Sequence, residues 1–180
     1  MGAYEGALRR AIVSYKYGGE RRWAEVFARM LVGFLARHAG WFEEYTVLCP
    51  VPSYRGAGAR RSWGPVETFC SEVPRLACGL WPVEALVTKV AETGPVTGRN
   101  GPARREMAAR SVRPALLVPR PQLVSGARIL LVDDVCSSGA TLLAVARALK
   151  LAGADEVAAL VLARARWRGG PLSEDQSPTT

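Results

Sequence analysis

Residues 129–141 hold the residue types of this chain that are best suited to chemistry. Four apolar residues come first, and the carboxylates Asp133 and Asp134 follow at once. A turn of two serines and a glycine at 137–139 comes next, and Thr141 opens a segment compatible with a helix. Backbone N–H groups and hydroxyls at a helix start can surround a phosphate, and glycine lets the backbone come close to it. The order predicts a sugar-phosphate site whose carboxylates meet the vicinal hydroxyls of the sugar.

This stretch resembles the signature with which type I phosphoribosyltransferases bind 5-phosphoribosyl-1-diphosphate (PRPP). The signature is an apolar strand, an acidic pair, a short hydroxyl-bearing loop, a glycine and a threonine, and all thirteen positions match without a gap. The resemblance implies that Asp133 and Asp134 bind the ribose hydroxyls, directly or through water or Mg²⁺, and so favour a cationic sugar. The residues that would hold the 5-phosphate are Cys136, Ser137, Ser138, Gly139, Ala140 and Thr141. The alternative is an ordinary strand–helix junction with a serine cap and an exposed acidic pair.

A second loop, 50–62, is basic and follows another predicted strand. Ligands of open α/β sheets bind beyond the carboxyl ends of the strands. The resemblance implies that this loop binds the pyrophosphate of PRPP, with Arg60 and Arg61 as further donors because the arginine fork suits phosphate oxygens. The residues that we assign to the pyrophosphate are Pro52, Ser53, Tyr54 and Arg55. The alternative is an ordinary surface connection of Pro, Gly and Arg.

A third segment, 92–106, is polar and rich in Gly, Pro and Arg. We expect it to act as a lid that excludes water, since water would otherwise hydrolyse PRPP. Its candidates for reaching the pyrophosphate are Arg99, Arg104 and Arg105. A solvated charged loop is the equally plausible alternative.

Within the type I family, the chain resembles the ComF-like branch. Residues 16–18 are similar to its Lys-aromatic-x-Gly segment, and 49–52 to its Pro-Val-Pro strand end. Two departures are visible: 61–64 keeps only the arginine and the aromatic residue, and Val96 stands at the usual glutamine. The resemblance implies transfer of a phosphoribosyl group to or from a nitrogenous base with pyrophosphate exchange. The alternative is a non-catalytic PRPP sensor, or a ComF-like accessory of competence and DNA uptake.

Composition sets the frame for these assignments. The chain has 180 residues, 49% of them apolar, and a net charge of +8, which predicts one domain over 1–167 followed by a disordered tail over 168–180. The positive charge suits a polyphosphate substrate; it is compatible with nucleic acid, but no run of five Lys or Arg argues for it. No apolar run reaches the ~20 residues of a membrane helix, and the N-terminus lacks a secretory signal. We therefore expect a cytoplasmic protein without membrane contact, whose acceptor base no residue pattern identifies; many relatives form homodimers.

Apolar spacing predicts the elements that position these loops. Strands that alternate with helices indicate an α/β fold, a Rossmann-like parallel sheet flanked by helices as in the type I phosphoribosyltransferase fold, with a small hood near 4–17 and 162–168. Cys136 is interpreted as apolar filler, with an activated thiol at a helix N-terminus as the alternative. The predicted helices cover 3–17, 21–38, 65–80 with a kink at Pro74, 103–110 and 141–151; the predicted strands cover 45–51, 83–90, 116–118, 129–132 and 156–163.

Overall fold

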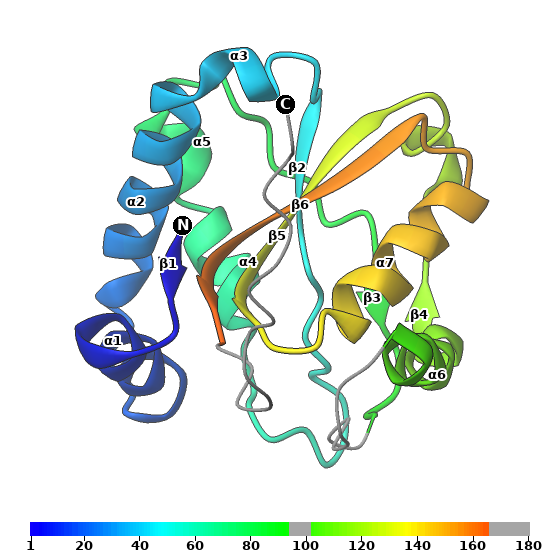
Figure 1. Ribbon diagram of the computed structural model, residues 1–180, viewed down its shortest axis with the longest axis horizontal. Helices are drawn as coiled ribbons and strands as arrows, with labels where there is room; N and C mark the ends of the chain where they lie inside the picture. The colour runs from blue at the N-terminus through cyan, green and yellow to red at the C-terminus, as the bar shows by residue number, and fades with distance from the viewer. Residues whose placement is uncertain (94–101, 166–180) are drawn as a thin grey trace, which may run out of the picture.

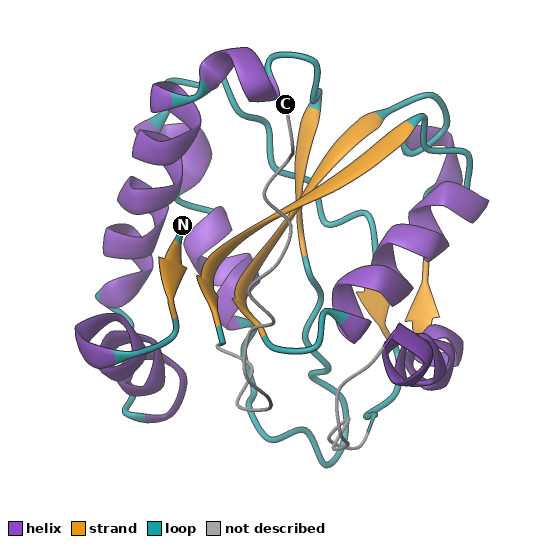
Figure 2. Ribbon diagram, in the orientation of Figure 1, coloured by secondary structure: helices purple, strands orange, loops and turns teal. Residues whose placement is uncertain are grey.

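The central element is a sheet of four parallel strands. The computed structural model describes residues 1–93 and 102–165. The strand order is β1-β6-β5-β2, and residues 82–84 extend the sheet beyond β2 through a parallel bridge between Leu48 and Val83 (Figures 1 and 2). The predicted parallel α/β sheet is confirmed. The strands are β1 (Gly2–Ala3), β2 (Val47–Pro50), β5 (Arg128–Cys136) and β6 (Glu156–Arg164).

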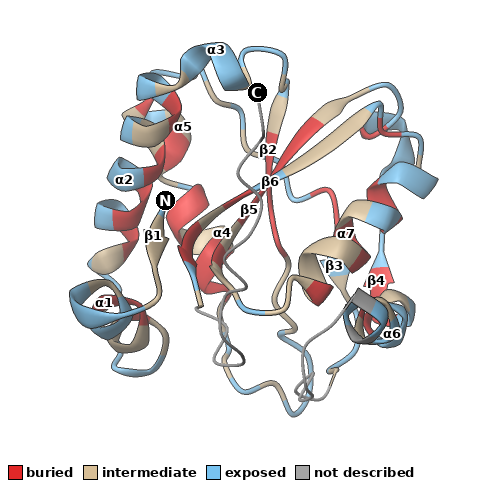
Figure 3. Cartoon of the chain, in the orientation of Figure 1, coloured by how far each residue is buried: buried red, intermediate tan, exposed pale blue. Residues whose placement is uncertain are grey.

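Helices cover both faces of this sheet, and each face has its own apolar core (Figure 3). Successive side chains of a strand point to opposite faces. Leu130 and Val132 of β5 therefore enter one core, and Ile129 and Leu131 enter the other. The apolar run before the acidic pair thus contributes side chains to the cores on both faces of the sheet. The first core is shared with α1 (Gly6–Tyr17), α2 (Trp23–Arg37), α4 (Pro65–Cys70) and α5 (Val73–Leu76), the second with α6 (Pro102–Val112) and α7 (Ala140–Leu151).

Strand β5 is longer than predicted. The sequence indicated an end at Val132, but pairing with β6 continues through Asp133 to Cys136, which lies opposite Arg164. The reason is tertiary, because β6 supplies pairing partners for Asp133, Val135 and Cys136. The acidic doublet consequently lies inside a strand, so its two side chains leave opposite faces of the sheet.

Three other elements also differ from their predictions. The strand predicted over 83–90 is reduced to β3 (Thr88–Lys89), which pairs antiparallel with β4 (Leu116–Leu117). The helix predicted over 65–80 is divided into α4 and α5, with Pro74 in the first turn of α5, where its missing N–H does no harm. Helix α1 starts at Gly6 because residues 2–3 join the sheet. Short elements that were not predicted are α3 (Ala39–Phe42), η1 (Arg113–Ala115) and η2 (Pro121–Leu123).

Two cysteines and the end of the chain complete the description. Cys49 lies buried in β2 and Cys70 lies buried in α4. The tail predicted over 168–180 lies outside the described residues. Within 1–93 and 102–165, none of the helices combines the length and the apolar character needed to cross a membrane.

Candidate functional site

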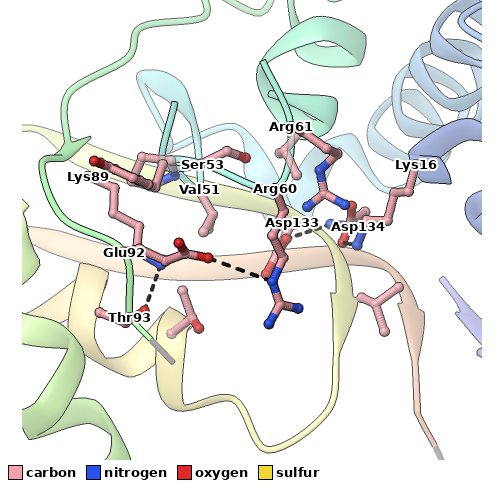
Figure 4. A pocket seen from close by; sticks show the side chains of 15 residues that line it. Lys16, Val51, Ser53, Arg60, Arg61, Lys89, Glu92, Thr93, Asp133 and Asp134 are labelled. Carbon is pink, nitrogen blue, oxygen red and sulfur yellow. Dashed lines mark hydrogen bonds and ion pairs between the residues drawn. The ribbon is translucent and has the colours of Figure 1, made fainter. Parts of the chain in front are cut away.

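A cleft of about 310 Å³ opens at the carboxyl end of the sheet, between the loops that follow β2 and β5 (Figure 4). Asp133, Asp134 and Thr141 line it from one side, and residues 52–54 line it from the other. The structure thus brings together the two loops that were predicted to share a ligand. The other lining residues are Lys16, Val51, Arg60, Arg61, Val66, Lys89, Glu92, Thr93 and Val135.

Other predicted site residues lie outside the lining of this cleft. Arg55 is exposed, and its guanidinium is 3.1 Å from the carboxylate of Glu67 on α4. Arg99 lies outside the described residues, as does the side chain of Arg104, and Arg105 is exposed on α6. The remaining predicted phosphate ligands form the bend between β5 and α7, next to Thr141: Cys136, Ser137, Ser138, Gly139 and Ala140.

The bend at 137–139 has the backbone shape that its glycine predicts. Gly139 adopts a left-handed conformation with φ of +76° and directly precedes α7, and the Ala140 N–H donates to Ser138 Oγ at 3.3 Å. Ser137 is exposed and Ser138 is half-buried, so the bend is not sunk into an apolar core. Burial raises the pKa of the Cys136 thiol, which disfavours the activated-thiol alternative.

The two carboxylates of the doublet have different surroundings. Asp134 is buried, and its Oδ1 accepts a hydrogen bond from Lys16 Nζ at 2.8 Å. Asp133 accepts the Asp134 N–H at 2.8 Å. Desolvation, with the neighbouring charge of Asp134 as a smaller cause, raises the pKa of Asp133 to about 8. A strongly shifted carboxyl group that faces a cleft is typical of a functional site.

The raised pKa of Asp133 makes stability depend on pH. A carboxyl group whose pKa is higher in the folded state favours folding below its unfolded pKa, and this contribution is lost as pH rises toward about 8. Asp133→Asn keeps the acceptor for the Asp134 N–H and removes the ionisation. We expect urea unfolding at pH 8.5 to show a gain on the order of 3 kcal/mol over wild type, and almost no gain at pH 4. Asp155→Asn, at a surface carboxylate, is the control; an equal gain at both pH values would contradict this prediction.

Glu67 holds the loop after β2 in place. Its carboxylate accepts the Ser53 N–H at 2.9 Å, the Ser53 hydroxyl at 3.2 Å and Arg55 Nη2 at 3.1 Å. Gly64 makes room for this arrangement, since a Cβ there would lie 2.1 Å from a Glu67 carboxylate oxygen. The predicted pyrophosphate loop is therefore positioned by a residue of α4 that the sequence did not single out.

Glu67→Gln is expected to loosen this loop without unfolding the protein. An amide offers fewer acceptors than a carboxylate and turns an N–H₂ donor toward its former donors, at a cost of about 1 kcal/mol or more. Hydrogen exchange of the Ser53 amide should accelerate about tenfold by local opening. Glu72→Gln, at an exposed partner of Arg75, should leave this amide unchanged. Equal protection of the Ser53 amide in Glu67→Gln and wild type would show that other contacts fix the loop.

The cleft also contains four cations, which come from α1, the loop after β2, and β3. Arg60 lies 3.6 Å from Glu92, and Lys89 Nζ donates to Thr93 Oγ1 at 2.7 Å. Burial lowers the pKa of Lys89. Arg61 places its guanidinium 5.2 Å from the ring centroid of Tyr17. Together with Lys16, these cations give the cleft the character of a polyanion site that also contains carboxylates.

The carboxylates of the cleft could bind Mg²⁺ together with a phosphorylated ligand. Across the described ranges, 1–93 and 102–165, no group of three or more His, Cys, Asp or Glu residues is arranged to hold a metal ion. Mg²⁺ commonly binds through one or two carboxylates, several waters and the phosphates of a substrate. The doublet fits Mg²⁺ that arrives with a phosphorylated ligand.

Comparison with known proteins tests the family that the signature predicted. The family model described as "phosphoribosyl transferase domain" matches residues 85–177, just over half of the chain. The chain belongs to this family. The matched region contains the whole β5–α7 unit of this phosphoribosyl transferase domain, and therefore its acidic doublet and its bend.

Solved structures similar to this phosphoribosyl transferase domain are distant in sequence. One is described as the allosteric regulatory enzyme of purine biosynthesis: it is 21% identical, the match covers 67% of this chain and 23% of that chain, and the TM-score is 0.37. Another is a hypoxanthine phosphoribosyltransferase from Trypanosoma cruzi in a ternary complex with substrates, 16% identical, with coverage of 80% and 66% and a TM-score of 0.42. The chain thus spans less than a quarter of the first protein. No curated protein matches the chain.

Proposed function

We propose that this protein binds PRPP with Mg²⁺ in the cleft and transfers the phosphoribosyl group to, or from, a nitrogenous base with exchange of pyrophosphate. Membership of the phosphoribosyl transferase family supports this class of chemistry. The observation that carries the proposal is the convergence in one cleft of the acidic doublet, the start of α7 and the loop after β2. The ComF-like branch stays a prediction.

We assign a separate group of residues to each part of PRPP: the ribose, the 5-phosphate and the pyrophosphate. The doublet faces the ribose hydroxyls, and the bend at 136–141 holds the 5-phosphate with N–H groups and hydroxyls. Residues 52–54, with Arg60 and Arg61, hold the pyrophosphate. Arg55 supports that loop through Glu67 instead of binding the pyrophosphate itself.

The proposed reaction forms a bond between a base nitrogen and C1 of the ribose while the bond from C1 to the pyrophosphate oxygen breaks. Positive charge develops on the sugar, and the doublet stabilises it when both carboxyl groups are ionised. A cation that binds beside Asp133 would favour that ionised form. The cations of the cleft stabilise the charge that collects on the leaving pyrophosphate. When bound, Mg²⁺ would neutralise part of that charge and orient the phosphate oxygens. Closure of a lid over 92–106 stays a prediction; of its candidate residues, the structure describes the side chain of Arg105 alone.

The test is turnover of PRPP to pyrophosphate with a panel of purines and pyrimidines, with and without Mg²⁺. We expect pyrophosphate release that requires both Mg²⁺ and one class of base. Tight PRPP binding without release under any condition would favour the sensor alternative. Absence of PRPP binding would refute both.

A further inference from the structure

We propose that Lys16 and Arg61 together bind the diphosphate of the substrate, and that Asp134 positions Lys16 instead of binding the ribose. This inference rests on the proposed function and divides the work within the acidic doublet. It assigns the ribose hydroxyls to Asp133 alone.

The first argument is the side of the sheet to which Asp134 points. Asp134 shares its face of β5 with Leu130 and Val132, which belong to the same core as α1. Its Oδ1 lies 2.8 Å from Lys16 Nζ, at the end of α1, and the exposed fractions of the two side chains are 6% and 18%. The Asp134 side chain is therefore almost closed to solvent and is held by Lys16. Asp133 leaves the opposite face.

The second argument is the donor capacity of Lys16. An ammonium group has three N–H donors, and the hydrogen bond to Asp134 uses one of them. Lys16 also lines the cleft. A ligand oxygen can accept a further N–H there while Asp134 fixes the position of the ammonium group. The carboxylate therefore fixes the position of this ammonium group in the cleft.

The third argument is the state of Arg61. Its Nη1 is buried and has no hydrogen-bond partner among the described residues. A buried donor without a partner costs free energy, so it requires an explanation. Figure 4 shows Arg61 and Lys16 directed toward the same end of the cleft, beside Asp134. A phosphate oxygen at that end would supply the acceptor that Arg61 lacks.

The fourth argument is the contrast between Arg61 and Arg55. Arg55 lies outside the cleft lining and contacts Glu67 at 3.1 Å. Arg61 instead lies over the ring of Tyr17, the residue next to Lys16, and its Nη1 remains available to donate to an anion. A diphosphate needs several cationic donors, and the arginine fork can bind two of its oxygens at once.

The experiment separates the two ends of the substrate. Calorimetry in the presence of Mg²⁺ measures the affinity for pyrophosphate and, separately, for ribose 5-phosphate. Lys16→Met and Arg61→Met should each weaken pyrophosphate binding tenfold or more, by the loss of one charge-assisted interaction worth about 1.4 kcal/mol or above, and change ribose 5-phosphate binding less than about twofold. Lys150→Met, at a lysine near the opposite edge of the sheet that donates to the Asp155 carbonyl, should leave both affinities unchanged.

The role of Asp134 is tested by a double-mutant cycle. Asp134→Asn should weaken pyrophosphate binding in the wild type, add little in the Lys16→Met background, and spare ribose 5-phosphate in both. Lys16→Arg should restore most of the pyrophosphate affinity, and Lys16→Gln replaces Lys16→Met if that variant does not fold. Undiminished pyrophosphate binding in Lys16→Met or Arg61→Met would overturn the inference while the proposed function stands. So would an equal loss of ribose 5-phosphate affinity from Asp134→Asn in both backgrounds. A wild type that binds neither fragment nor PRPP would instead refute the proposed function, and this inference with it.

Discussion

The combined change Asp133→Asn with Asp134→Asn is expected to reduce PRPP affinity by at least about 100-fold while the fold survives, because each carboxylate supports charge-assisted hydrogen bonds worth roughly 1.5–3 kcal/mol. Asp133 would lose its bonds to the ribose, and Lys16 would lose the partner that fixes it. The fold should persist because the first change removes a desolvated carboxyl group and the second keeps an oxygen acceptor for Lys16.

This prediction is checked by calorimetry with PRPP and Mg²⁺, together with a thermal melt that shows one cooperative transition. The matched control is Asp155→Asn with Glu156→Gln, a second adjacent acidic pair, which contacts Arg128 at the opposite edge of the sheet. The control should lose some stability and keep its PRPP affinity. Wild-type affinity in the doublet variant would show that neither carboxylate binds the ribose or supports a residue that binds the substrate.

The sequence predicts the β5–α7 unit well because its signals are local. An apolar run, a glycine and a hydroxyl-bearing turn each constrain the backbone within a few residues, and the left-handed Gly139 is the direct result. The same holds for the second loop, whose place after a strand is sufficient to put it at the carboxyl edge of the sheet. These two loops therefore meet where the sequence indicates.

What the sequence does not reveal depends on partners that are distant along the chain. Lys16 and Asp134 are separated by 118 positions, so their hydrogen bond arises only when α1 packs beside β5. The engagement of Arg55 by Glu67 likewise requires α4 to lie against the loop. Lys89 and Thr93 line the cleft because the chain that follows residues 82–84 passes beside it. An arginine count alone cannot show which arginine of a loop is free to bind an anion.

The second large effect is expected from Gly139→Val. A β-branched residue strongly disfavours the φ of +76° that this position adopts, at a cost of about 1–3 kcal/mol. A steric clash of the new Cβ is not the cause of this cost, because its nearest neighbour would be Cys136 Sγ at 3.7 Å, an ordinary van der Waals contact. The bend would therefore relieve the strain by shifting, and it would no longer present its N–H groups to the 5-phosphate. We expect ribose 5-phosphate affinity to fall by about 10- to 100-fold.

Gly126→Val is the control that separates binding from strain. Gly126 lies before the other end of β5, with φ of +72° and no atom within 4 Å of a Cβ. Both valine variants should lose similar stability in urea unfolding, because the backbone strain is alike. Only Gly139→Val should lose affinity for ribose 5-phosphate in calorimetry, since Gly126 lies at the edge of the sheet opposite the cleft. If both variants bound this ligand as tightly as wild type, the 5-phosphate would have to sit elsewhere than on the bend, and the assignment of residues 136–141 would be wrong.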